Sequence, residues 1–177
     1  MIYGRDYLRE YQARAATPLG KRIYQARWDL VSQWANGGAL LDYGCGSGAF
    51  HMGAPPYFQA TGFDINPYCD WTGPIPMQLD VLTMWDVIEH LPDPYQPLKL
   101  GAQWVFLSTP NIDNSGDVVR DWKHFKPGEH LHYFNLKSLK AVLACAGYDY
   151  VTHNFDEGVI RDPNNPEAII SVVARRD

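Results

Sequence analysis

Three alternating glycines follow an apolar segment that contains an acid near its end. Residues 39–43 are apolar except for Asp42, and Gly44, Gly46 and Gly48 come directly after them. Glycine adopts backbone angles that a side chain forbids, and it lets a ligand lie against the main chain. A buried strand that opens into such a turn is typical of a site for a flat, polar ligand. An ordinary strand-to-helix turn gives the same pattern, so a second signal is needed.

The second signal is another short strand that ends in an acid. Residues 59–63 form a short strand-like stretch, and Asp64 follows them. In a doubly wound α/β sheet, an acid at the end of the second strand faces the crevice beside the first turn, where a ribose binds. An ionised carboxylate only accepts hydrogen bonds, so Asp64 can accept from both ribose hydroxyls. The sequence therefore predicts a ligand that contains a ribose.

The spacing of the glycines distinguishes two classes of such ligands. Dinucleotide-binding proteins use Gly-x-Gly-x-x-Gly and place the pyrophosphate on a helix N-terminus, whereas this turn reads Gly-x-Gly-x-Gly. Asp42, just before the turn, would repel a pyrophosphate but can accept a hydrogen bond from a ligand ammonium, directly or through water. The turn therefore favours S-adenosylmethionine, which carries an amino-acid tail, over a nicotinamide cofactor.

Four segments together resemble the Rossmann-like (class I) family of S-adenosylmethionine-dependent methyltransferases. Residues 41–48 and 62–67 resemble the first and second motifs of that family, residues 80–94 resemble the fourth, and residues 104–111 resemble the fifth strand. The resemblance implies a three-layer α/β fold with a doubly wound sheet and an antiparallel C-terminal hairpin. The residues expected to bind the cofactor are Asp42, Gly44, Cys45, Gly46, Gly48, Asp64, Ile65, Met84, Trp85 and Asp86.

The middle of the chain departs from the family pattern. Only residues 66–79 separate the second strand from the segment that resembles the fourth motif, and they contain three prolines and a glycine. A helix, a strand and another helix normally occupy this place, and each parallel crossover needs a dozen or more residues. We predict that the third strand and its helices are lost or vestigial, which leaves about six strands. Trp71, Ile75 or Met77 is then expected to stack on the adenine.

Two histidines are candidates for the base that takes the proton of the methyl acceptor. His90 follows the strand at residues 81–85, whose C-terminal end lies beside the first turn. His130 lies in a long polar and aromatic loop, residues 111–135, and such loops often form substrate sites or lids. A histidine pKa near neutrality suits a general base. Alternatively, His90 packs behind the site, and Glu89 has the same two interpretations.

The same loop contains residues that bind metals in other proteins. It holds His124, His130 and His132 as well as Asp121 and Glu129. However, a His-x-His pair alone lacks the context of most zinc sites. Methyl transfer from a sulfonium also needs no Lewis acid. The sequence therefore predicts no metal.

Composition and charge indicate a single globular domain. The chain has 177 residues, of which 46% are hydrophobic and 20% are charged. Its net charge of −5 gives no general affinity for nucleic acid, and no apolar run approaches the length of a membrane span. The spacing of the three cysteines indicates no disulfide framework, which favours a reducing, cytoplasmic location.

The first part of the chain is predicted to be helical. Apolar side chains recur at helical spacing in residues 3–15 and again after Thr17, an N-cap that is followed by proline. We expect residues 1–38 to form a helical cap and residues 39–177 to form the S-adenosylmethionine-binding domain. Such a cap either covers the edge of the sheet or closes over the cofactor.

These expectations together predict a methyltransferase that acts on an oxygen or nitrogen atom of a small molecule. The methyl donor is already activated, so the protein mainly supplies proximity and a place for the acceptor proton. Two other classes fit less well. One is an S-adenosylmethionine-binding pseudoenzyme or interaction subunit without turnover, and the other is a nicotinamide-dependent oxidoreductase. The sequence predicts neither a membrane nor a nucleic-acid partner, and it leaves the oligomeric state unknown.

Overall fold

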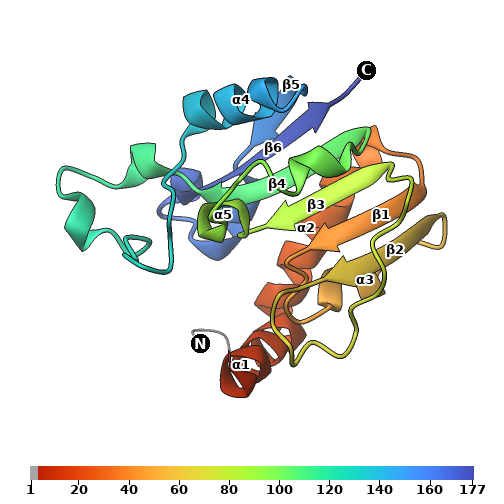
Figure 1. Ribbon diagram of the computed structural model, residues 1–177. Helices are drawn as coiled ribbons and strands as arrows, with labels where there is room; N and C mark the ends of the chain where they lie inside the picture. The colour runs from red at the N-terminus through yellow and green to blue at the C-terminus, as the bar shows by residue number, and fades with distance from the viewer. Residues whose placement is uncertain (1–3) are drawn as a thin grey trace.

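The centre of the protein is a six-stranded mixed sheet (Figure 1). The structure is a computed structural model that describes residues 4–177. Its strands are β1 (Gly38–Tyr43), β2 (Phe58–Phe63), β3 (Val81–Trp85), β4 (Trp104–Pro110), β5 (Asp149–Asn154) and β6 (Ile169–Arg175). They lie in the order β2-β1-β3-β4-β6-β5. The first four strands are parallel, and β6 runs antiparallel to both β4 and β5, as the predicted C-terminal hairpin requires.

Five α-helices surround the sheet in the described part of the chain. They are α1 (Arg5–Ala16), α2 (Pro18–Trp34), α3 (Ala49–Met52), α4 (Leu136–Cys145) and α5 (Asp156–Arg161). Thr17 begins α2 as predicted, because its side chain accepts a hydrogen bond from the Gly20 amide. Residue 3, where the first helix was expected to start, lies outside the described residues. Within residues 4–177, no helix combines the length and apolar character that crossing a membrane requires.

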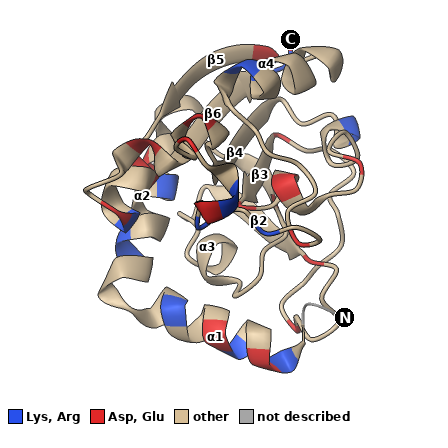
Figure 2. Ribbon diagram, turned by 90° about the vertical axis from the view of Figure 1, so that its left-hand side faces the viewer, with Lys and Arg blue, Asp and Glu red and all other residues tan. Residues whose placement is uncertain are grey.

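Helix α1 carries residues of both charges along its length (Figure 2). Its arginines pair with acids three or four residues away, Arg9 with Asp6 and Arg14 with Glu10. These side chains are largely exposed, and such pairs contribute little to stability. The charges of α1 are therefore those of a solvated helix surface.

Alternate residues of the strands pack into two cores on opposite faces of the sheet. Leu41 and Leu107 join one core with the buried leucines of α4. Leu40 and Phe106, their neighbours in sequence, join the other core with Trp28 of α2. Successive side chains of a strand point to opposite faces, so this division follows directly from the apolar sequence of each strand. The result is the predicted three-layer α/β fold.

The connection from β2 to β3 contains neither a helix nor a strand. It comprises residues 64–80, all of which the structure describes. A parallel bridge joins Gly62 to Thr72, and the Gly73 amide donates a hydrogen bond to the Gly62 carbonyl at 2.9 Å. These contacts are a remnant of pairing where a further strand would lie. The prediction of a lost or vestigial third strand is therefore confirmed.

Strand β1 is the topological switch point of the sheet, because the chain adds β2 on one side of β1 and then crosses to add β3 on the other side. β2 pairs with one side of β1, and β3 pairs with the other side. The carboxyl ends of these parallel strands meet at one edge of the sheet. In such folds the ligand site lies at this edge.

Candidate functional site

The glycine turn after β1 has a backbone that only glycine adopts readily. Gly44, Gly46 and Gly48 have φ angles of 79°, 48° and 75°. A Cβ on Gly44 would lie 2.5 Å from a methyl group of Val87, and a Cβ on Gly48 would lie 2.5 Å from the ring of Trp71. In contrast, a Cβ on Gly46 would meet nothing closer than 3.9 Å. The turn is therefore packed at both ends and open in the middle.

Substituting Gly44 with alanine is expected to destabilise the fold. The left-handed backbone costs an alanine about 1 kcal/mol, and overpacking against Val87 costs about 2 kcal/mol more. Gly116→Ala is a matched control, because Gly116 has a φ of 73° and nothing within 4 Å of its Cβ position. Urea unfolding should show a clearly larger loss for Gly44→Ala than for Gly116→Ala. Equal losses would contradict the close packing of the turn.

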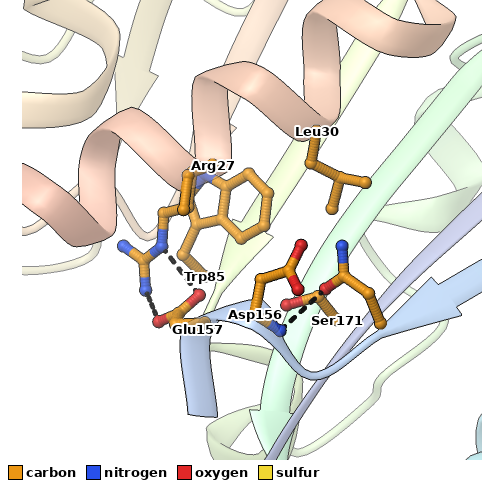
Figure 3. A pocket seen from close by; sticks show the side chains of 8 residues that line it. Arg27, Leu30, Trp85, Asp156, Glu157 and Ser171 are labelled. Carbon is orange, nitrogen blue, oxygen red and sulfur yellow. Dashed lines mark hydrogen bonds and ion pairs between the residues drawn. The ribbon is translucent and has the colours of Figure 1, made fainter. Parts of the chain in front are cut away.

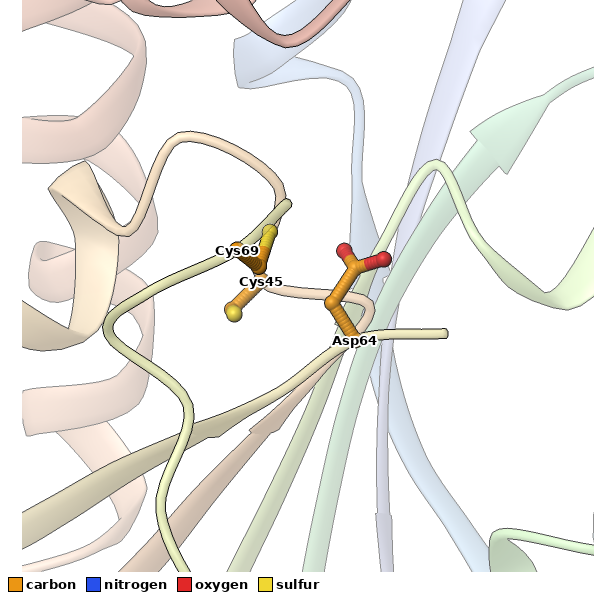
Figure 4. A group of neighbouring side chains, drawn as sticks. All are labelled: Cys45, Asp64 and Cys69. Atoms are coloured by element: carbon orange, nitrogen blue, oxygen red, sulfur yellow. The ribbon is translucent and has the colours of Figure 1, made fainter. Parts of the chain in front are cut away.

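Asp64 connects the glycine turn to the end of β2. Its Oδ2 accepts a hydrogen bond from the Gly46 amide, and its Oδ1 accepts one from the Asn66 amide, both at 2.8 Å. Figure 4 shows the carboxylate beside the segments that carry Cys45 and Cys69. Each carboxylate oxygen has two lone pairs, so each can accept a further hydrogen bond. Asp64, the residue predicted to bind a ribose, therefore lies at the open part of the turn.

The segment after β2 covers one side of the turn. The carbonyl of Gly46 accepts hydrogen bonds from Cys69 Sγ at 3.2 Å and from Trp71 Nε1 at 3.1 Å. Burial and the charge of Asp64 raise the pKa of the Cys69 thiol to about 12, so it stays a neutral donor at pH 7. Trp71 therefore lies against the turn. Of the other predicted adenine contacts, Ile75 and Met77 have exposed side chains.

Three other predicted cofactor-binding residues lie in different environments. Asp42 is buried, and its carboxylate accepts a hydrogen bond from Thr83 at 2.9 Å and lies 3.6 Å from His51 Nδ1. Met84 is fully buried in the core that faces α4. Ile65, by contrast, is 71% exposed. Asp42 and Met84 are therefore buried near the carboxyl ends of β1 and β3, and of these three residues only Ile65 presents its side chain to solvent.

Asp86, directly after β3, belongs to a group of four charges, of which Arg27 and Glu157 are buried and Asp86 and Arg161 are partly buried. Its Oδ2 accepts a hydrogen bond from Arg27 at 3.1 Å and another from Arg161. Both arginines also bind Glu157, and Arg27 does so with two nitrogens, at 2.5 and 3.1 Å. The Arg27 guanidinium lies 5.0 Å from the ring centroid of Trp85. Figure 3 shows Arg27, Trp85 and Glu157 together on the wall of a small cavity beside α2.

The four side chains Arg27, Asp86, Glu157 and Arg161 form an ion cluster, and electrostatics keep Asp86 and the two arginines charged. Burial alone would raise the pKa of Asp86, but Arg161 and Arg27 outweigh it and hold that pKa below its ordinary value. Burial likewise opposes the charge of Arg161, but Asp86 and Glu157 raise its pKa. Asp86 is therefore an anion whose Oδ2 already has two partners. Helix α5, which supplies Glu157 and Arg161, has no counterpart in the elements expected from the sequence.

The two candidate catalytic histidines come together beyond the end of β3. His90 ends the short 3₁₀ helix η1 (Ile88–His90), and its ring packs edge to face on that of His130, with centroids 4.7 Å apart. His90 Nδ1 lies 2.9 Å from the Glu129 carbonyl oxygen. A carbonyl only accepts, so Nδ1 carries the proton and Nε2 carries the lone pair of the neutral ring. Burial lowers the pKa of His90.

Glu89 lies next to this pair and is almost fully buried. Its side chain is 2% exposed, and neither carboxylate oxygen has a hydrogen-bond partner within residues 4–177. Burial, assisted by the charge of Asp86, raises the pKa of Glu89 to about 8. Burial and then His90 and Lys126 lower the pKa of His130 to about 4, so its imidazole is neutral at pH 7.

Comparison with known proteins identifies the family. A family described as a methyltransferase domain matches residues 7–153. A SAM-dependent methyltransferase from Archaeoglobus fulgidus has a similar structure, with a TM-score of 0.65, 18% identity and coverage of 97% of this chain and 100% of that one. Magnesium protoporphyrin IX methyltransferase from Synechocystis PCC 6803 with bound SAH has a TM-score of 0.65, 16% identity and 98% coverage of both chains.

The fold also occurs within a much larger protein. The small RNA methyltransferase HEN1 has a TM-score of 0.63 and 17% identity over 90% of this chain, which spans only 26% of that protein. None of the curated proteins matches the chain. The family match covers most of the chain, and the fold and the glycine turn agree with it. The chain therefore belongs to the Rossmann-like S-adenosylmethionine-dependent methyltransferases, and S-adenosylmethionine is its methyl donor.

Proposed function

We propose that the protein methylates an oxygen or nitrogen atom of a small molecule. The observation that carries this proposal is the direct contact between the glycine turn and the segment that leads to the histidines. Gly44 packs so closely on Val87 that a Cβ would lie 2.5 Å from it, and Val87 directly precedes η1. The expected cofactor turn and the group His90 and His130 are thus neighbours at one edge of the sheet. A methyl acceptor between them would reach both.

The cofactor-binding roles follow from the exposed groups at this edge. Asp64 would accept hydrogen bonds from the ribose hydroxyls, and the open backbone around Gly46 would hold the methionine tail, with Cys45 contributing through its main chain. The exposed Ile65 would lie beside the adenine. Gly44 and Gly48 would give the turn its shape. The buried residues Asp42, Met84 and Trp85 and the partly buried Asp86 would act by shaping the turn and the end of β3.

The N-terminal helices are proposed to close over the cofactor. A Cβ on Gly46 would have Tyr11 of α1 as its nearest side chain, at 3.9 Å, and the Arg5 guanidinium lies 4.8 Å from the ring centroid of Tyr68. Tyr24 of α2 is within 3.1 Å of the Ser47 hydroxyl. These contacts bring both helices to the glycine turn, which supports a cap formed by residues 1–38.

The proposed reaction is an in-line displacement. The acceptor atom forms a bond to the methyl carbon while the carbon–sulfur bond breaks, and the electron pair stays on sulfur to give S-adenosylhomocysteine. The acceptor proton passes to a neutral imidazole, His90 through Nε2 or His130. Both imidazoles have lowered pKa values and are weak bases, which suffices because the sulfonium is already a reactive donor.

Calorimetric titration with S-adenosylmethionine and S-adenosylhomocysteine tests the proposal. We expect micromolar binding of both and no binding of NAD. Methyl transfer from a radiolabelled donor is then measured on small hydroxylated compounds, small amines and short RNA. Transfer to a small molecule supports the proposal, and transfer to RNA alone would contradict it. Cofactor binding without any turnover would favour the interaction subunit. The three free cysteines agree with the proposed cytoplasmic location.

A further inference from the structure

Two thiols and a carboxylate come together beside the glycine turn. Cys45 belongs to the turn, Asp64 follows β2, and Cys69 lies in the connection from β2 to β3. One ligand atom from each of these three residues lies within 4.8 Å of the other two. Both cysteines are buried free thiols. Three potential ligands of a single ion therefore share one small region of the molecule (Figure 4).

Hydrogen bonds to the backbone fasten the two chain segments that carry these ligands. Asp64 accepts hydrogen bonds from the amides of Gly46 and Asn66. The Cys69 thiol donates to the Gly46 carbonyl, and the Cys69 amide donates to the Asn66 carbonyl at 3.1 Å. The Asn66 side chain in turn accepts from the Tyr68 amide at 3.0 Å. This short turn returns the chain to the glycine turn, so the ligands are close together before any ion arrives.

The distances between these ligand atoms are within reach of a common ion. Zn²⁺ lies about 2.3 Å from a thiolate sulfur and about 2.0–2.2 Å from a carboxylate oxygen. The ligand atoms of a tetrahedral ion are therefore about 3.5–3.8 Å apart. The limit of 4.8 Å exceeds this separation by about an ångström, which a change of side-chain torsion in a cysteine can supply.

The donor set selects a cation that binds sulfur. Thiolate ligands favour zinc and related soft ions, whereas Mg²⁺ and Ca²⁺ take oxygen ligands. Burial raises the pKa of both thiols, so each is neutral without an ion. A bound cation supplies the positive charge that deprotonates a coordinating thiol, and each thiol proton leaves to solvent as its sulfur binds the ion.

We propose that Cys45, Asp64 and Cys69 form an inhibitory binding site for a thiophilic divalent cation of the zinc and cadmium class. Asp64 is also the proposed ribose ligand, so an ion on its carboxylate and the cofactor exclude each other. This consequence rests on the proposed function. The sequence predicted no metal because the histidines of the loop 111–135 lack a suitable pattern, and the two cysteines lie on separate segments.

Titration of the reduced, chelator-free full chain with Co²⁺ tests the site. Thiolate complexes of Co²⁺ have a charge-transfer absorption in the near ultraviolet, which oxygen and nitrogen ligands do not produce. We expect one bound ion per chain with this absorption, and displacement of Co²⁺ by Zn²⁺. Cys69→Ser should weaken Co²⁺ binding at least about tenfold and reduce the absorption per bound ion. The serine hydroxyl can still donate to the Gly46 carbonyl, but it is not a soft ligand.

Cys145→Ser is the matched control for this titration. Cys145 is exposed and lies at the end of α4, so its substitution should leave both the Co²⁺ affinity and the absorption unchanged. Circular dichroism confirms that each variant is folded.

Competition with S-adenosylhomocysteine tests the inhibition. Calorimetry on the ion-free protein first gives the Kd of S-adenosylhomocysteine. At about ten times this concentration, mutually exclusive binding should lower the apparent affinity for Co²⁺ about tenfold. In Cys69→Ser, Zn²⁺ should no longer inhibit S-adenosylhomocysteine binding at concentrations that inhibit the wild type.

The outcomes separate this inference from the proposed function. The site is wrong if no thiolate absorption forms, if Cys69→Ser matches the wild type, or if Cys145→Ser loses the absorption. Full Co²⁺ affinity at saturating S-adenosylhomocysteine would overturn the inhibition. If the ion binds but the ion-free protein does not bind S-adenosylhomocysteine, the proposed function fails and the cation site stands. If S-adenosylhomocysteine binds and no thiolate complex forms, the cation site alone fails.

Discussion

Asp64→Asn is expected to weaken S-adenosylmethionine binding by about 100-fold, which corresponds to the loss of about 3 kcal/mol from two hydrogen bonds to a charged group. The carboxylate already accepts from the amides of Gly46 and Asn66 and has capacity for two ribose hydroxyls. An asparagine has one accepting oxygen, and its amide nitrogen only donates. The asparagine side chain can therefore accept hydrogen bonds from the backbone amides of the turn or from the ribose hydroxyls, but not from both sets. Calorimetry with S-adenosylhomocysteine measures the loss.

Asp70→Asn provides the matched control for this experiment. Asp70 lies in the same connection between β2 and β3, is exposed, and carries the same charge. Its substitution should leave cofactor affinity within about twofold, because exposed surface charges contribute little. The unfolding free energy of both variants must be measured as well, since Asp64 also binds the backbone of the turn. Near-normal affinity in a folded Asp64→Asn protein would remove the ribose assignment.

Glu157→Gln is expected to lower the free energy of unfolding by about 3 kcal/mol. Glu157 is 2% exposed and binds Arg27 through both oxygens and Arg161 through one. The glutamine keeps the size of the side chain but removes the negative charge and directs an N–H toward a guanidinium. Asp86 would then be the remaining acid of the ion cluster for two arginines, the buried Arg27 and the partly buried Arg161. Urea unfolding at neutral pH measures the effect.

Asp156→Asn is the control for this prediction. Asp156 is the adjacent acid, lies in the same first turn of α5 and is exposed. Its substitution should change the unfolding free energy by less than about 0.5 kcal/mol. Similar small effects in both variants would mean that the ion cluster contributes nothing to stability, and that the fold tolerates unbalanced charge at this edge.

The parts of the fold that the sequence predicts depend on local patterns. Gly44, Gly46 and Gly48 all have a positive φ, which glycine adopts more readily than other residues. The residue type alone therefore predicts this turn. Asp64 follows its strand directly, so topology places it at the turn. The missing third strand is equally predictable, because residues 66–79 are too few for two crossovers. Each of these inferences uses only residues that lie within about twenty positions of one another in the sequence.

The parts that the sequence does not predict depend on contacts between distant segments. Arg27 and Glu157 are 130 positions apart, and neither has a neighbour in sequence that reveals the pair. Helix α5 has only six residues, too short to show a helical period. His90 and His130 were identified separately, but their edge-to-face contact and the burial of Glu89 beside them follow from the loop that folds back on η1.

The ion cluster also sets the order in which the protein can mature during synthesis. Arg27 and Asp86 leave the ribosome long before Glu157 and Arg161, which lie between the last two strands. Until then Arg27 lacks its bidentate partner, and β4 lacks β6, its neighbour on one side. The nascent chain therefore cannot complete the edge where the cofactor is expected to bind. S-adenosylmethionine would meet a finished binding site only after translation has passed the C-terminal hairpin.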